Sequence, residues 1–166
     1  MKKEVSEIDQ KMAGCESIIT SHLGNQVFGL PILTVNDVIA QGAMTRVPLG
    51  PPEVAGLINL RGRIVTAIDM HRRFGRAVGK PAEGSRGIGT VIVVDGEWYS
   101  LMFDRIGEVV PVSDVVMMPL PPTVRPEVAA LSFGVAKRPD ELVIMLDVKK
   151  ILEIPSLQAT KLDLAS

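Results

Sequence analysis

The sequence predicts a mainly β protein made of two similar small β-units. Short apolar runs rich in Val, Ile and Leu alternate with turn signals that contain Gly, Asn, Asp and Pro. This spacing of short strands is typical of small barrels. Helical signals are few and short. The first half of the chain also aligns with the second half, which favours a duplicated unit.

The composition is that of an ordinary globular protein with an aliphatic core. Of the 166 residues, 46% are apolar, 22% are charged and 4% are aromatic. A chain of this length buries enough surface to fold without disulfides. The net charge of −1 argues against a general nucleic-acid or anionic-membrane binder. A single cysteine, Cys15, fits a reducing compartment, and no run reaches the ~20 apolar residues of a membrane span. We therefore expect a soluble, cytoplasmic protein.

The duplication has two spacings. At a spacing of 71, residues 23–30 align with 94–101, and Asp37 and Val38 align with Glu108 and Val109. At a spacing of 78, residues 63–74 align with 141–152. Aliphatic strands align easily by chance, but here the turns, an acidic residue and a helix start align as well. A period above 70 residues is too long for a solenoid and suits two β-units.

Each repeat is expected to contain hairpins, further strands and a closing helix. Residues 1–14 are polar and are expected to form a mobile tail or a weak helix. Hairpins are expected at 18–30, 57–69, 90–103 and 131–146. Further strands are expected at 32–39, 44–47, 106–110 and 115–118, with Pro-rich connectors at 48–52 and 119–127. Short helices are expected at 70–74 and 148–154, and a flexible connection at 75–89.

The central hairpin places Arg61 at its tip. Gly62 permits the positive φ that a tight turn requires, and the flanking runs are apolar on both sides. Asp69 then suits the N-cap of the short helix that follows. An arginine on such a tip is either a solvated turn residue or a recognition residue.

The sequence contains no arrangement of residues that indicates catalysis. His22 and His71 lie in different elements, Cys15 has no histidine near it in sequence, and no cluster has metal-ligand spacing. Phosphate-binding and dinucleotide-binding loops are absent from the sequence. The interpretation is a binding module that is not an enzyme and uses no cofactor or metal.

The chain resembles the CheW-like chemotaxis coupling proteins between about Cys15 and Leu152. The residues that carry the resemblance are Pro52-Glu53-Val54-Ala55-Gly56, Leu57-Ile58-Asn59-Leu60-Arg61-Gly62, Asp104-Arg105-Ile106-Gly107-Glu108 and Leu142-Val143-Ile144-Met145-Leu146-Asp147. The resemblance implies two five-stranded SH3-like barrels packed side by side, with a short helix after the last strand of each. It also implies a scaffold that bridges the cytoplasmic tip of chemoreceptors to the regulatory domain of the histidine kinase CheA, and so is recruited to receptor arrays. The alternative is a regulatory CheW-like module of another two-component or chemosensory pathway.

With this resemblance, the CheW-like domain is expected at 15–154, between the N-terminal tail (1–14) and a C-terminal tail (155–166). Subdomain 1 is expected at about 26–75. Subdomain 2 is expected at about 88–154, completed by the first strand at 16–23.

Two sets of binding residues follow from the resemblance and the strand pattern. Val35, Asp37, Val38 and Arg61 are expected to bind the receptor, although Val38 could instead pack in the core. Apolar contact would supply affinity there, and the acidic residue would set the register.

Gly56, Thr90 and Val109 are expected at or near the contact with the kinase. Gly56 is glycine either because a partner backbone comes close or because the turn needs it. The side chain of Val109 is either exposed or packed in the core with its apolar neighbours.

Overall fold

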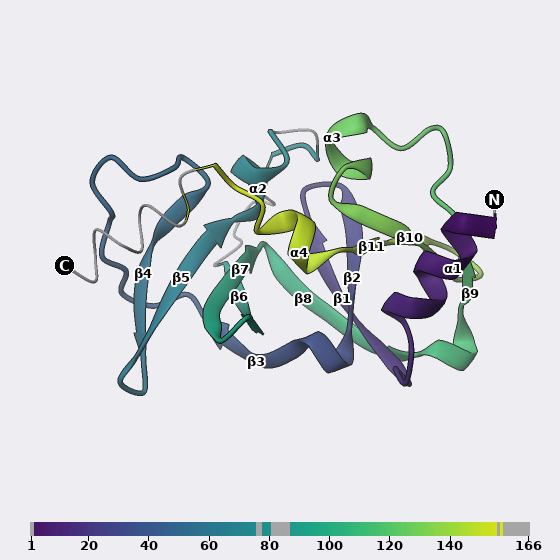
Figure 1. Cartoon of the computed structure of the whole chain (residues 1–166), viewed down its shortest axis with the longest axis horizontal. Helices are drawn as coiled ribbons and strands as arrows, with labels where there is room; N and C mark the ends of the chain where they lie inside the picture. The colour runs from purple at the N-terminus through teal and green to yellow at the C-terminus, as the bar shows by residue number, and fades with distance from the viewer. Residues whose placement is uncertain (1, 76–77, 81–86, 156, 158–166) are drawn as a thin grey trace.

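The computed structural model describes residues 2–75, 78–80, 87–155 and 157, and these form two β-sheets with short helices. In Figure 1 the hairpin of β4 and β5 lies at one end of the molecule, and the N-terminal helix α1 lies at the other. The connection expected at 75–89 and the C-terminal tail lie largely outside the described residues. Leu157 is described and is buried, with 3% of its surface exposed.

Each sheet combines strands from both halves of the chain. The six-stranded sheet has the order β8 (Arg105–Pro111), β1 (Ser17–Leu23), β2 (Gln26–Pro31), β11 (Leu142–Leu146), β10 (Ser132–Lys137) and β9 (Val116–Met118). The five-stranded sheet has the order β3 (Val35–Ala40), β6 (Ile88–Val94), β7 (Glu97–Phe103), β5 (Arg63–Asp69) and β4 (Val54–Leu60). Neighbouring strands are antiparallel, except that β2 pairs with β11 and β5 pairs with β7 in parallel.

The duplicated units exchange their first hairpins. The spacing of 71 relates β1, β2 and β3 to β6, β7 and β8, and the spacing of 78 relates β4 and β5 to β10 and β11. Hairpin β1–β2 nevertheless joins the sheet of β8, β10 and β11, and hairpin β6–β7 joins the sheet of β3, β4 and β5. The first strand completes the sheet of the second subdomain, as expected, but β2 joins that sheet as well, and β6 and β7 of the expected subdomain 88–154 join the sheet of the expected subdomain 26–75. The reason is physical: turn signals define a hairpin locally, whereas the two parallel pairings decide which sheet it joins.

The predicted hairpins and caps are present. Arg61 and Gly62 form the tight turn between β4 and β5, with φ of 53° and 83°. The side chain of Asn59 closes this turn by accepting a hydrogen bond of 2.9 Å from the N–H of Gly62. Asp69 caps helix α2 (Met70–Arg73), and Asp147 caps helix α4 (Val148–Ile151).

Several expected elements differ from the structure. The strand expected at 32–39 begins with a 3₁₀ turn, η1 (Ile32–Thr34), because Pro31 ends the pairing of β2 with β1. The strand expected at 44–47 is reduced to a single bridge between Thr45 and Leu57. A second 3₁₀ turn, η2 (Val112–Asp114), and a short helix, α3 (Pro126–Ala129), lie in the long connection between β8 and β10.

The N-terminal segment forms a helix, the second of the two forms expected for residues 1–14, and not a mobile tail. Helix α1 (Lys2–Lys11) lies beside β9 and β10 (Figure 1). Its Ile8 is 5% exposed and packs with Phe133 and Val143. Met12, four positions further on, is partly buried against the same cluster. Val5, Ile8 and Met12 are spaced at i, i+3 and i+7, which is the apolar spacing of one helix face.

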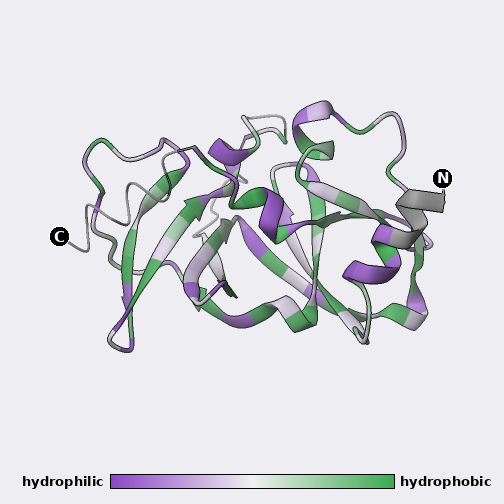
Figure 2. Cartoon of the chain, in the orientation of Figure 1, coloured by the Kyte–Doolittle hydropathy of each residue, from purple (hydrophilic) through white to green (hydrophobic). Residues whose placement is uncertain are grey.

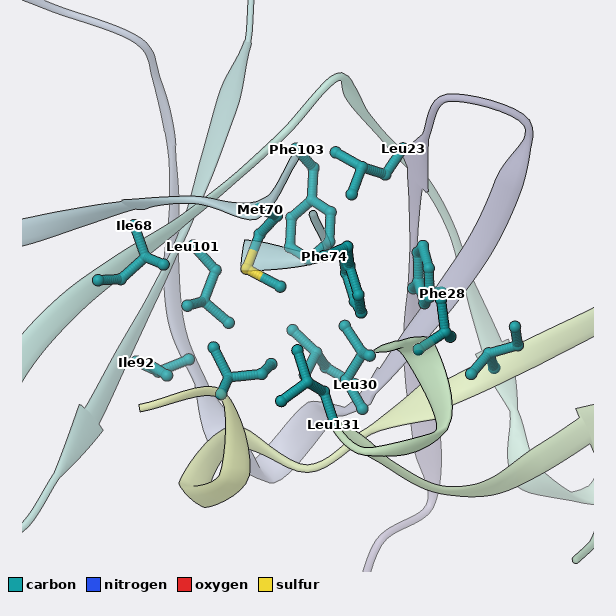
Figure 3. Close-up of a cluster of buried hydrophobic side chains, with 14 of the residues drawn as sticks. Leu23, Phe28, Leu30, Ile68, Met70, Phe74, Ile92, Leu101, Phe103 and Leu131 are labelled. Carbon is teal, nitrogen blue, oxygen red and sulfur yellow. The ribbon is translucent and has the colours of Figure 1, made fainter. Parts of the chain in front are cut away.

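The largest core cluster is shared by the two sheets. It includes Leu23, Phe28 and Leu30 of the six-stranded sheet and Ile92 and Leu101 of the five-stranded sheet, which face one another in Figure 3. The rings of Phe28 and Phe74 stack with centroids 4.9 Å apart. Apolar residues are concentrated along the strands, as the green segments in Figure 2 show. The two sheets therefore pack against each other through this shared cluster.

Candidate protein-binding interface

The structure brings Arg61 and Asp37 together on the surface of the five-stranded sheet. Nη2 of Arg61 lies 3.3 Å from Oδ2 of Asp37, and the two side chains are 80% and 31% exposed. Strands β3 and β4 stand at opposite ends of the strand order, so this contact spans the two edges of a strongly curled sheet. Neither residue is near the other in sequence. The ion pair therefore depends on the closed fold.

Local backbone structure fixes both side chains. The ladder between β3 and β6 shifts register between Val35 and Asp37. Oδ1 of Asp37 accepts a hydrogen bond of 2.8 Å from the N–H of Val38, which orients the carboxylate and leaves Oδ2 for Arg61. Arg61 itself has a positive φ at the hairpin tip, an uncommon conformation for a residue with a side chain.

The two valines of the expected receptor site differ in environment. Val38 is 40% exposed, so it does not pack fully in the core. Val35 is half-buried and lines a groove with a cavity volume of about 390 Å³. Leu33 and Val93, which are 68% and 39% exposed, also line this groove, together with Val148 of helix α4. A groove with aliphatic side chains, and with Thr34, Asn36, Asp95 and Lys149 among its lining residues, thus opens on the strand that carries Asp37.

Gly56 and Thr90, two of the three expected kinase contacts, are buried. A Cβ added to Gly56 would lie 2.7 Å from the carbonyl oxygen of Thr45, so the close backbone belongs to this chain itself. Thr90 is 0% exposed, between Val38 of β3 and Leu101 of β7. Neither residue is available to touch a partner directly, because both are buried.

Val109, the third expected kinase contact, is exposed on the other sheet. It lies on edge strand β8 with 55% of its surface exposed. Its neighbour Glu108 pairs with Arg138, with Oε2 and Nη2 3.5 Å apart. Arg138 also donates a hydrogen bond of 2.6 Å to Glu141. Partial burial lowers the pKa of Arg138, but these carboxylates outweigh that effect and raise it.

This group repeats the arrangement around Arg61. Glu108 and Val109 are the counterparts of Asp37 and Val38 at the spacing of 71, and Arg138 begins the last hairpin turn as Arg61 begins the central one. Sequence reasoning did not single out Arg138, because the turns of the two hairpins differ in length. The duplication was the signal that could have identified it.

The titratable groups elsewhere serve the fold. Nε2 of His71 lies 2.8 Å from Oδ1 of Asp104, whose Oδ2 accepts a hydrogen bond of 2.8 Å from the N–H of Gly24. Burial lowers the pKa of His22, and the neighbouring Arg105 lowers it further. In the described part of the chain, no group of three or more His, Cys, Asp or Glu residues is placed to hold a metal ion. No helix among the same residues is long and apolar enough to cross a membrane.

Two joined β-barrels that carry exposed valines beside acid–arginine pairs define a class of protein that binds other proteins through its surface. Comparison with known proteins supplies the family. The family model of the CheW-like domain matches residues 17–156. The chain therefore belongs to the CheW-like family.

Individual relatives agree with this assignment. The chemotaxis protein CheW of Treponema pallidum is 26% identical over 143 residues, which cover 85% of this chain and 84% of that protein. The chemotaxis protein CheW of Helicobacter pylori is 28% identical over 131 residues, covering 79% and 78%. The crystal structure of the scaffolding protein TtCheW from Thermoanaerobacter tengcongensis superimposes with a TM-score of 0.73 at 29% identity, covering 85% of this chain and 94% of that one.

These comparisons confirm the expected fold of two SH3-like barrels, the six-stranded one having the short β9 in addition. They also support a chemotaxis adaptor role for the chain.

Proposed function

We propose that this protein is a non-enzymatic scaffold that couples chemoreceptors to the histidine kinase CheA. The observation that carries the proposal is the surface formed by Val38 and the Arg61–Asp37 pair next to the groove lined by Val35. Exposed aliphatic side chains provide area for contact, and an exposed ion pair selects the partner by charge. Because the pair is exposed, its rearrangement on binding costs little.

The cytoplasmic tip of a chemoreceptor is the proposed partner of this surface. Such a tip is a helical hairpin, and helices bind grooves through aliphatic residues spaced along one face. Leu33, Val35 and Val93 would meet that face, while Asp37 and Arg61 would fix its register. The protein would thereby be recruited from the cytoplasm to receptor arrays.

The regulatory domain of CheA is the proposed partner of the six-stranded sheet. Val109 lies on an edge strand with the Glu108–Arg138 pair beside it. An edge strand presents unpaired backbone groups to which a partner strand can bond. Gly56 and Thr90 would then support such contacts from within the other sheet, since both residues are buried.

The proposal is tested with purified receptor tips and the CheA regulatory domain, each titrated against the wild-type chain and Val35→Lys. A folded Val35→Lys variant that loses receptor binding and keeps kinase binding is the expected result. Normal receptor affinity in the folded variant would remove the groove from the site. If the wild-type chain binds neither partner, the protein serves another pathway.

A further inference from the structure

The N-terminal segment packs on the six-stranded sheet through Ile8 of helix α1, and Met12, just after the helix, is partly buried against the same cluster. Ile8 is 5% exposed and contributes to the cluster that contains Phe133. It lies where Gly134 leaves room, since a Cβ added to Gly134 would come within 3.1 Å of Ile8 Cδ1. Ile8 is thus placed over a glycine of the sheet.

Two ion pairs flank this contact. Oε1 of Glu7 lies 3.5 Å from Nζ of Lys150, and Nζ of Lys11 lies 3.1 Å from Oδ2 of Asp147. Asp147 is 3% exposed, so its carboxylate is shielded from water, whereas the Lys11 side chain is 34% exposed. The helix therefore binds through the sequence Glu-Ile-x-x-Lys, in which the two charges stand on either side of the aliphatic residue.

The five-stranded sheet has the same receiving residues at the spacing of 78. They are Gly56 for Gly134, Asp69 for Asp147, and Arg72 for Lys150. Their local geometry also agrees. Each glycine follows a register shift in its ladder, and each aspartate caps its helix through Oδ1. Each glycine also faces a backbone carbonyl oxygen, that of Thr45 or that of Met118.

A groove takes the place of the helix on the five-stranded sheet. Its cavity volume is about 400 Å³, and its lining includes Met44, Ala55, Asp69 and Arg72. Ala55 is the counterpart of Phe133, and the smaller side chain leaves the surface hollow. The Sδ of Met44 lies 3.3 Å from the Cβ position of Gly56, comparable to the place of Ile8 at Gly134. Methionine is flexible and yields to an incoming side chain.

In the described part of the chain, Arg72 and Asp69 pair with each other, and Nη1 of Arg72 also donates a hydrogen bond of 3.1 Å to the carbonyl oxygen of Pro52. Nε of Arg72 lies 3.6 Å from Oδ2 of Asp69, and the two side chains are 59% and 33% exposed. On the six-stranded sheet, the corresponding lysine and aspartate pair instead with Glu7 and Lys11. An exposed ion pair contributes little stability, so Arg72 and Asp69 can separate at low cost, and each can then bind an opposite charge of a partner.

We propose that this groove binds an amphipathic helix of a partner protein. The helix presents an acidic residue to Arg72, an aliphatic residue directly after it to the hollow beside Met44, and a basic residue three positions further on to Asp69. These three requirements follow from Glu7, Ile8 and Lys11 of α1, which make the corresponding contacts on the six-stranded sheet. The inference does not depend on coupling of receptor to kinase, because its test contains neither of them.

The test uses a synthetic peptide of residues 1–14 and the full chain, whose own α1 covers the other site. Titration followed by amide NMR shifts is expected to show saturable one-to-one binding, with shifts at 44–55 and 69–72. Asp69→Asn removes the charge and keeps a good N-cap, and Arg72→Glu reverses an exposed charge. Each variant is expected to weaken binding by about tenfold, because each removes or reverses a charge that pairs with the opposite charge of the peptide. A peptide with Glu7→Lys is expected to restore binding to the Arg72→Glu chain.

A control chain with Lys149→Glu, exposed on α4 and outside the groove, is expected to bind the peptide normally. Absence of saturable binding would overturn the proposal, as would affinities that the Arg72→Glu variant leaves unchanged. Shifts confined to 132–134 and 147–150 would show that the peptide only exchanges with α1. If the chain sediments as a dimer and deletion of residues 1–14 abolishes that dimer, the occupant is a second copy and the assignment to a partner protein fails.

Discussion

Arg73 donates a hydrogen bond of 2.7 Å from Nε to the carbonyl oxygen of Ile151, its own counterpart at the spacing of 78. Nη2 of the same guanidinium donates to the carbonyl oxygens of Lys150 at 3.0 Å and Glu153 at 3.4 Å. Helix α2 follows the five-stranded sheet and α4 follows the six-stranded one. One arginine therefore satisfies the carbonyl groups at the end of the opposite helix and joins the two units.

We expect Arg73→Ala to lower the free energy of unfolding by about 1.5–3 kcal/mol, as losses of charge-assisted hydrogen bonds do. Burial lowers the pKa of Arg73, in agreement with its position between the two helices. Urea unfolding followed by circular dichroism measures the loss. Lys149→Ala, on the exposed face of α4, is the control and is expected to change stability by less than about 0.5 kcal/mol. Equal stability of the two variants would show that the guanidinium does not join the units.

Arg61→Ala is expected to leave stability within about 0.5 kcal/mol of wild type, because its side chain is 80% exposed. The same substitution is expected to weaken receptor binding, measured by calorimetry with a receptor tip. Asp37→Ala and the double variant complete a cycle with Arg61→Ala. A coupling energy near zero in binding would show that the ion pair does not act as one recognition unit.

Gly56→Ala is expected to destabilise the protein by about 1–3 kcal/mol, because overpacking against a fixed backbone group is costly. The new Cβ would lie 2.7 Å from the carbonyl oxygen of Thr45. Gly134→Ala, at the counterpart position, meets Met118 O at 3.0 Å and is expected to destabilise in the same way. A Gly56→Ala chain that keeps its thermal midpoint but loses kinase binding would instead indicate that the partner needs this glycine.

The hairpins, their turns and the two capping aspartates could be predicted from sequence, since Arg61-Gly62 and Asp69 act through local backbone geometry. The exchange of hairpins could not, because the pairings β2–β11 and β5–β7 join segments far apart in the chain. The burial of Thr90 could not be predicted either, because it also depends on contacts between distant segments. Thr90 lies on β6, which is paired with β3 on one side and with β7 on the other. The residue pattern of β6 alone does not show that strands lie on both of its sides. Of the candidate site, the sequence indicated Asp37 and Arg61 separately, and only the closed sheet places them 3.3 Å apart.

Stability is expected to fall with acid because of His22. Burial, and then Arg105, lower the pKa of His22 below its ordinary value of 6.5. The unfolded chain therefore binds a proton at His22 more readily than the folded chain, and stability is lost as the pH falls below 6.5. His22→Gln removes this contribution. Urea midpoints of wild type and variant should differ by a constant amount above that pH, and the wild type should lose stability relative to the variant below it. A difference that stays constant at acid pH would contradict this.

Val109→Asp is expected to fold normally and to lose binding to the CheA regulatory domain. Val109 is 55% exposed on edge strand β8, so a carboxylate there stays in water. It would, however, place a second negative charge beside Glu108 and remove apolar area from the proposed contact.

Val110 is the matched control, because it is 3% exposed and packs in the same cluster as Ile8. Val110→Asp should unfold the chain, since a buried unpaired charge is costly. Calorimetry measures binding, and circular dichroism measures folding. A folded Val109→Asp variant with wild-type affinity would exclude β8 from the kinase surface and leave the Arg138 hairpin as the next surface to test.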